Sequence, residues 1–106
     1  MTTLSVPVDK EGFLIDLSDW SDDIAIEIAA IEGIALNDEH WEIIHLLRDF
    51  YHTYDLSPAM RVLVKAIKKE LGPEKASSIY LMTLFPESPA KIAAKIAGLP
   101  KPDNCL

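Results

Sequence analysis

The fold of this 106-residue chain is decided by the stretch NDEHWEIIHLLRDFYHTYD, residues 37–55. Asn37 is a favourable helix N-cap, and Asp38 and Glu39 place negative charge in the first turn, where the helix dipole stabilises it. The apolar residues behind them recur at helical spacing and form one stripe, made of Ile43, Leu47, Phe50 and Tyr54. The stretch therefore predicts the longest helix of the chain, and we expect it to be the central element of the core.

Four more helices are predicted around it from their start and stop signals. Their expected ranges are 21–33, 57–72, 73–85 and 88–98. Serine is the expected N-cap of three of them (Ser21, Ser57 and Ser88), and the prolines Pro58 and Pro89 suit the first helical position. Glycine ends the same three helices. In the helix over 57–72, the residues expected to face the core are Met60, Leu63, Val64, Ile67 and Leu71.

The segment before these helices has a different pattern. In LSVPVDKEGFLIDL, residues 4–17, apolar residues alternate and then follow a DKEG turn, which predicts a short β-hairpin or meander. The expected fold class is therefore α+β and predominantly α, with a small N-terminal β-meander packed on an orthogonal bundle of about five helices.

A different kind of structure is expected beyond Gly98, because Pro100 and Pro102 lack the backbone N–H that a helix needs. We expect residues 1–98 to form a single globular domain. Residues 99–106 are expected to form an extended, mobile C-terminal arm, with a reach of roughly 25 Å at full extension. The one cysteine of the chain, Cys105, lies near the tip of this arm.

The charge and the apolar content of the chain exclude several classes of protein. No apolar run approaches the roughly 20 residues that a membrane-spanning helix needs, and the start MTTLSVPVDK has no long apolar core of a secretion signal, so we expect a cytoplasmic protein. The net charge of −7 disfavours non-specific binding to nucleic acid. That charge is uneven, because residues 1–55 carry 13 acids against 2 bases and residues 56–106 carry 4 acids against 8 bases.

The single cysteine excludes a disulfide framework and a multi-cysteine zinc site. A lone thiol is most often an ordinary small residue, but a structural cysteine is typically buried, and Cys105 follows PKPDN at the end of the sequence. A thiol in that position is exposed and can enter another protein's active site. Since Lys101 would favour its thiolate only weakly, a partner's pocket would have to activate it. These features are typical of a carrier whose chemistry is completed by other enzymes.

Six segments of the chain resemble the DsrC/TusE family of sulfur-trafficking proteins. In order they are HWEIIHLLRDFY, LSPAMRVLVKAI, GPEK, SIYL, LFPESPAK, and KIAGLPKP followed by a penultimate cysteine. The resemblance covers nearly the whole chain and implies a small fold of helices, with a short N-terminal β-meander and a mobile C-terminal arm. It also implies that Cys105 carries sulfur as a persulfide. Persulfide transfer needs no metal or organic cofactor, and we expect none.

Ala94 assigns the chain to one branch of that family. Members that act in sulfite reduction and sulfur oxidation carry a second cysteine at this position, eleven residues before the penultimate one, and alanine cannot form their disulfide. The single-cysteine branch, TusE, implies a sulfurtransferase that accepts sulfur from a TusBCD-like complex. It passes the sulfur to a tRNA 2-thiouridylase of the MnmA type, which modifies the wobble uridine. We therefore expect the protein to contact tRNA only indirectly, through that acceptor. Three positions depart from the family pattern: Thr83, where arginine is usual, and Ala76 and Ser77, where Gly-Asn is common.

Other side chains are candidates for docking a partner or for a metal site. The docking candidates are Lys101, Lys91, Lys95, Arg61 and Lys65, although each lies on a face that could also be an ordinary solvated surface. His45 and His52 are about 10 Å apart along the helix axis, too far to bind one ion, so no metal site is expected. His40 is expected to be partly buried, and Trp20 and Trp41 are expected to pack in or against the core.

Two other functions stay open at this point. One is a DsrC-like sulfur carrier in sulfur oxidation. The other is a regulatory or DNA-binding module, because the helices over 37–55 and 57–72 have a helix-turn-helix outline with basic residues on the second helix. The start of that helix, SPAM, offers few side chains that read bases, which ranks this function below sulfur carriage.

Overall fold

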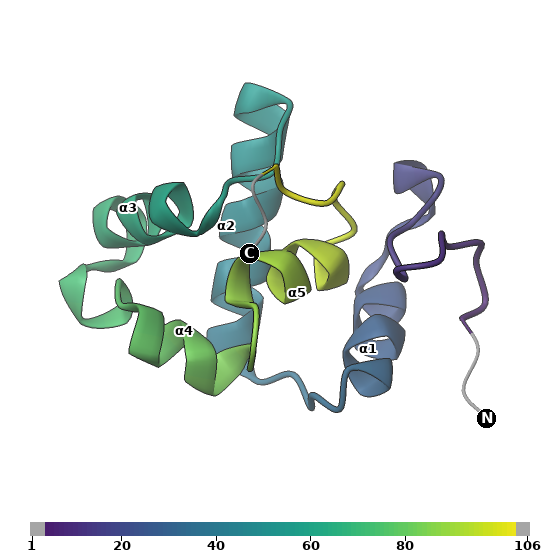
Figure 1. Ribbon diagram of the computed structural model, residues 1–106, viewed down its shortest axis with the longest axis horizontal. Coiled ribbons are helices and arrows are strands. Elements are labelled where there is room, and N and C mark those ends of the chain that lie inside the picture. The colour runs from purple at the N-terminus through teal and green to yellow at the C-terminus, as the bar shows by residue number, and fades with distance from the viewer. Residues whose placement is uncertain (1–3, 104–106) are drawn as a thin grey trace.

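The computed structural model describes residues 4–103, and all the secondary-structure elements named within them are helices (Figure 1). In chain order its elements are η1 (Leu17–Asp19), α1 (Asp22–Ile31), α2 (Asp38–Tyr54), α3 (Met60–Leu71), η2 (Pro73–Lys75), α4 (Ser78–Leu84) and α5 (Pro89–Ile96), where η marks a 3-10 helix. None of these helices is long and apolar enough to cross a membrane. The prediction of a predominantly helical fold with five α-helices is confirmed.

The short helix α5 occupies the centre of the bundle and contacts each of the other four α-helices (Figure 1). Six of its eight residues are buried: Pro89, Ala90, Ala93, Ala94, Lys95 and Ile96. A helix that is surrounded on several sides needs small side chains for close approach, which explains its alanines. As predicted, residues 37–55 form the longest helix, α2, and its residues Ile43, Ile44 and Leu47 are fully buried in the core. Helix α2 crosses α5 and shares this core with it (Figure 1).

The predicted starts of α1 and α2 are confirmed. Ser21 caps α1 by accepting a hydrogen bond from the Ile24 N–H (3.2 Å). Asn37 caps α2 by accepting from the N–H groups of Glu39 and His40, and the Asn37 N–H donates to Nδ1 of His40 (3.1 Å). This is a capping box in which histidine takes the place of the usual Glu or Gln.

His40 is almost fully buried, at 6% exposed, and both of its ring nitrogens have partners. Nε2 lies 2.8 Å from the carbonyl oxygen of Leu84, which can only accept, so Nε2 carries the proton and donates it. The ring also packs edge-on against Phe85, at a centroid distance of 5.2 Å. His40 therefore ties the start of α2 to the end of α4 and has a structural role, as expected.

Two of the predicted helix boundaries are wrong, and a third helix starts at the predicted residue without the expected side-chain cap. Helix α3 begins at Met60 after an N-cap at Ala59, because the Ser57 hydroxyl donates to the Pro100 carbonyl oxygen instead of capping the helix. The helix predicted over 73–85 is split into η2 and α4, because Ser77 accepts from the Tyr80 N–H and starts a new helix there. Ser88 makes no side-chain cap, although Pro89 does occupy the first position of α5.

The predicted N-terminal β-meander is absent from residues 4–103, where the β pairing consists of one isolated antiparallel bridge between Val8 and Leu14. The Asp9 carboxylate accepts from the N–H groups of Glu11 and Phe13 and closes a tight turn between the bridged residues. Pro7 has no N–H to extend the ladder, and the chain enters η1 three residues after the bridge. The alternating pattern therefore forms a turn that packs on the helices.

Candidate functional site

The expected site residue, Cys105, lies outside the described residues. The structure does describe the segment that leads to it, residues 99–102, which we call the arm root. These four residues are the first half of the predicted C-terminal arm. Their contacts with the rest of the domain are described below.

The arm root begins with a sharp turn at the end of α5. Gly98 has a φ of +73°, a left-handed conformation that glycine adopts at little cost, and the next N–H, of Leu99, donates to the Ala94 carbonyl oxygen (2.9 Å). A Cβ added at Gly98 would lie 2.2 Å from Cδ1 of Trp20. Glycine is therefore required here twice, for its backbone conformation and for the close approach of an indole ring. Leu99 is itself buried, at 3% exposed.

Trp20 and Arg48 hold the end of α5 from outside. The indole Nε1–H of Trp20 donates to the Ile96 carbonyl oxygen (2.9 Å), and the Arg48 guanidinium donates to the Ala97 carbonyl oxygen (2.7 Å). The guanidinium also stacks over the Trp20 ring, 3.8 Å from its centroid. These contacts satisfy carbonyl groups that the helix end would otherwise leave without partners. The start of the arm root is thus placed by Trp20, which directly follows η1, and by Arg48 of α2.

Two further contacts attach the arm root to the body. The Ser57 hydroxyl, in the loop between α2 and α3, donates to the Pro100 carbonyl oxygen at 2.6 Å. Pro102 is buried, whereas Asp103 is exposed. The arm root therefore lies on the surface of the domain from Leu99 through Pro102.

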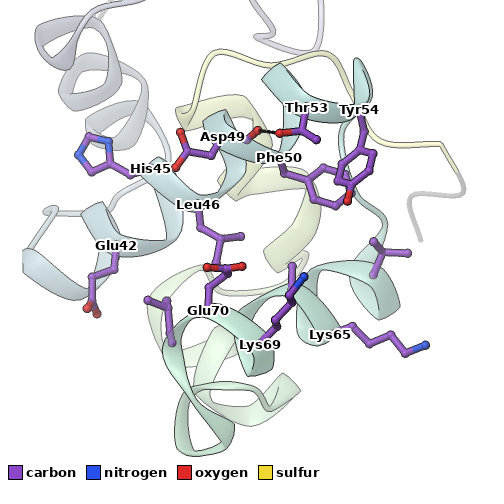
Figure 2. Close-up of a pocket in the computed structure, with 13 residues that line it drawn as sticks. Glu42, His45, Leu46, Asp49, Phe50, Thr53, Tyr54, Lys65, Lys69 and Glu70 are labelled. Atoms are coloured by element: carbon purple, nitrogen blue, oxygen red, sulfur yellow. Dashed lines mark hydrogen bonds between the residues drawn. The ribbon is translucent and has the colours of Figure 1, made fainter.

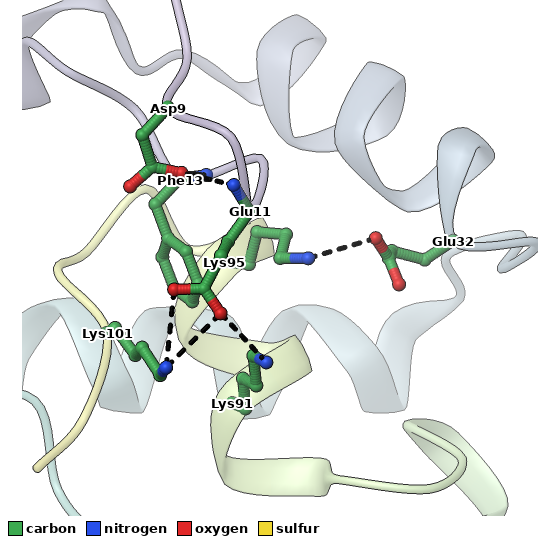
Figure 3. Close-up of polar contacts among 7 residues, drawn as sticks. All are labelled: Asp9, Glu11, Phe13, Glu32, Lys91, Lys95 and Lys101. Carbon is green, nitrogen blue, oxygen red and sulfur yellow. Dashed lines mark hydrogen bonds and ion pairs between the residues drawn. The ribbon is translucent and has the colours of Figure 1, made fainter.

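An ion cluster completes the attachment (Figure 3). The Glu11 carboxylate pairs with Lys101 of the arm root (3.2 Å) and with Lys91 of α5 (3.3 Å). These two ammonium groups, Lys101 first and Lys91 second, lower the pKa of the Glu11 carboxyl below its usual value. One carboxylate shared between two lysines leaves a net positive charge beside the arm root.

Lys95 lies in the same region, but its side chain is buried and contacts α1. Its ammonium group pairs with Glu32 of α1 (3.2 Å) and lies 5.3 Å from the centroid of the Phe13 ring, and the residue is only 7% exposed (Figure 3). A buried charge needs such a partner, since leaving it unpaired would cost several kcal/mol. Lys95 therefore holds α5 to α1.

The structure separates the five docking candidates into two groups. Lys91, Lys95 and Lys101 come together near Glu11, as Figure 3 shows. Arg61 and Lys65 are exposed on α3, apart from that cluster. Within residues 4–103, no group of three or more His, Cys, Asp or Glu side chains is placed to hold a metal ion.

Several residues of the arm root's surroundings were missed by the sequence analysis. Glu11 and Lys101 are 90 positions apart, and nothing in the local pattern around either one pairs them. Ser57 was assigned to a helix cap, because its sequence context fits that role equally well. The glycine and the prolines of KIAGLPKP do indicate a turn that ends the helix at this place.

Neutralising Glu11 is expected to loosen the arm root without unfolding the domain. In Glu11→Gln, the ion pairs to Lys91 and Lys101 are lost while the core is untouched, so we expect faster amide hydrogen exchange at Leu99 and only a small decrease in melting temperature, because exposed ion pairs contribute little to stability. Acid should act in the same way. Because the folded-state pKa of Glu11 is lowered, the stabilisation is complete above the ordinary pKa of about 4.5 and is lost as the pH falls through the lowered value.

A matched control is Glu70→Gln, which removes an exposed carboxylate from α3. It should leave exchange at Leu99 as in the unmodified protein. Equal exchange rates in both variants would contradict the role given to Glu11.

Comparison with known proteins identifies the family of the chain. A family model described as DsrC like protein matches residues 1–106. The chain is 52% identical to the sulfurtransferase TusE homolog of Haemophilus influenzae over 103 residues, covering 97% of this chain and 94% of that protein. It is also 52% identical to the sulfurtransferase TusE of Escherichia coli K12 over 101 residues, covering 95% and 93%.

Solved structures of similar proteins also superpose on this chain. The solution structure of DsrC from Allochromatium vinosum superposes with a TM-score of 0.85 at 49% identity, covering 93% of this chain and 88% of that one. The oxidized gamma-subunit of the dissimilatory sulfite reductase (DsrC) from Archaeoglobus fulgidus gives a TM-score of 0.80 at 40% identity, covering 95% and 92%. With a family model matched from end to end and relatives above half identity, the chain belongs to the DsrC-like protein family.

Proposed function

We propose that this protein is a sulfur carrier that holds one sulfur atom as a persulfide on Cys105. The observation that carries the proposal is the likeness to sulfurtransferases named TusE, at 52% identity over nearly the full chain. The arm root supports it, because its contacts hold residues 99–102 on the body and so fix the chain three residues before the only cysteine of the sequence. A carrier of this kind works with partner enzymes and has little turnover alone.

The chemistry is an exchange of one sulfur–sulfur bond for another. The Cys105 thiolate attacks the terminal sulfur of a donor persulfide, a bond forms between the two sulfurs, and the bond to the donor's own sulfur breaks. The donor leaves as a thiolate, so no external oxidant or reductant is consumed. In the second step an acceptor nucleophile takes the outer sulfur, and Cys105 is released as the thiol.

The proposed pathway is the thiolation of the wobble uridine of tRNA. The donor is a TusBCD-like complex, the acceptor is a tRNA 2-thiouridylase of the MnmA type, and the protein therefore works in the cytoplasm. Its net charge of −7 supports contact with tRNA only through the acceptor. The presence of alanine at position 94, fully buried in α5, supports this pathway over sulfur oxidation chemistry that uses a second thiol.

Intact-mass spectrometry tests the proposal. The purified protein is incubated with a cysteine desulfurase, cysteine and a sulfur-relay protein, and is then weighed without reduction. We expect a gain of one sulfur atom, about 32 Da, that a reducing agent removes. Cys105→Ala should show no gain. Added sulfur in that variant would contradict the assignment to Cys105.

A further inference from the structure

A groove of about 590 Å³ between α2 and α3 has no role in the function proposed so far (Figure 2). Its apolar lining comes from both helices and includes Leu46, Phe50, Val62 and Leu71. The side chain of Tyr54, at the end of α2, is 60% exposed and lines the same groove. Val62 on α3 is 42% exposed. A concave surface with this many accessible apolar side chains is typical of a binding site.

The groove lies beside the arm root. The loop over 55–59 joins α2 to α3 at the Tyr54 end of the groove, and Ser57 in this loop donates its hydroxyl hydrogen to Pro100. Figure 2 shows Tyr54 and Thr53 at this end and Glu42 at the other. A protein seated in the groove therefore lies next to the point where the arm leaves the body.

The length of chain after the arm root makes such contact necessary. Pro102 is buried on the body, and Cys105 follows it by three residues, which span at most roughly 11 Å. This is less than half of the reach expected for a free arm of eight residues. A partner that exchanges sulfur with Cys105 must therefore lie against the body near the arm root, an argument that rests on the proposed function.

The charges of the groove indicate what kind of partner it accepts. Lys65 and Lys69 line the α3 side and are exposed, and neither belongs to the ion pairs that the structure shows within residues 4–103. The α2 side carries Glu42 and Asp49, and Glu70 of α3 also lines the groove, beside Leu46 (Figure 2). Lys65 lies toward the Tyr54 end, so a bound segment would be oriented with its carboxylates toward Lys65 at that end.

We propose that this groove is the docking surface for the protein that donates sulfur to Cys105. The occupant is a segment of that donor with apolar side chains for the floor of the groove and carboxylates for Lys65 and Lys69. The acceptor fits less well, because an enzyme that binds tRNA needs basic surface around its active site, and such a surface would be repelled by Lys65 at the Tyr54 end of the groove, the end beside the arm root.

Charge reversal at one position of α3 tests the proposal. Lys65→Glu is expected to lower the second-order rate of loading from the sulfur-charged donor complex about tenfold, because it repels the donor's carboxylates. Loading from glutathione persulfide, which needs no docking, should be unchanged. Val62→Glu should slow loading from the donor complex in the same way, since it puts a carboxylate into the apolar floor.

The matched control is Lys68→Glu, which makes the same change of charge on an exposed residue of α3 that does not line the groove. It should load at nearly the normal rate. Equal effects of Lys65→Glu and Lys68→Glu would overturn the docking site in favour of a general charge effect. Normal loading of Lys65→Glu with slow transfer to the acceptor would overturn the choice of the donor. An unmodified protein that takes no sulfur even from glutathione persulfide would instead overturn the proposed function, and the docking site with it.

Discussion

Replacing Cys105 by serine is expected to abolish the tRNA 2-thiolation proposed for this protein. A serine hydroxyl is not ionised near neutral pH and forms no persulfide, and the chain has no second cysteine to take over the reaction. The measurement is the 2-thiouridine content of tRNA from an Escherichia coli strain that lacks its own TusE and expresses this chain. The unmodified chain should restore the nucleoside, and the Cys105→Ser variant should leave it at the level of the empty strain.

The control for this experiment is the stability of the variant. Within residues 4–103 the buried apolar core extends from Phe13 to Leu99, and serine is close to cysteine in size, so we expect the melting temperature of Cys105→Ser to equal that of the unmodified protein. Restoration of 2-thiouridine by the serine variant would exclude the persulfide mechanism. Restoration by neither chain would show that this protein does not serve the tRNA pathway.

Replacing Gly98 by alanine is expected to cause the largest loss of stability. The left-handed φ of +73° costs a residue with a Cβ about 1–2 kcal/mol, and overpacking typically costs a further 1–3 kcal/mol. Here the new Cβ would lie 2.2 Å from Cδ1 of Trp20, and three atoms of that side chain are within 3 Å. Relief of the clash would move Trp20 away from the Ile96 carbonyl and from Arg48. A total of about 3 kcal/mol lowers the melting temperature of a domain of this size by roughly 12–24 °C.

Gly33→Ala separates the two causes. Gly33 has a similar φ of +78°, but nothing lies within 4 Å of a Cβ added there. This variant should therefore show only the backbone cost, about 1–2 kcal/mol. Thermal unfolding followed by circular dichroism compares the two variants. Equal losses would mean that the contact between Gly98 and Trp20 has no energetic weight.

Most of the helical fold could be predicted from local signals. Ser21 and Asn37 cap α1 and α2 as expected, because a cap depends on residues only two or three positions away. The face of α3 expected to be apolar does pack on the core, with Leu63 and Ile67 fully buried. Such features follow from helical periodicity, which any sufficiently long segment shows on its own.

The local signals failed where a side chain had two uses. Ser57 fits a helix cap, but its hydroxyl binds the Pro100 carbonyl 43 positions away. The alternation in residues 4–17 fits a β-meander, but Pro7 and the Asp9 turn limit it to one bridge. In each case a tertiary contact or a missing N–H decided between structures that the local sequence allowed equally.

The sequence by itself therefore determined most of the helices, the place of the single thiol after a proline-rich segment, and the family, because these depend on neighbouring residues or on the order of motifs. Only the tertiary structure decided that α5 is central and that residues 99–102 are attached to the body. Those features rest on contacts such as Glu11 with Lys101 and Trp20 with Ile96, which are 90 and 76 positions apart. Contacts of this kind form because packing of the whole chain brings distant residues together, and no local pattern encodes them.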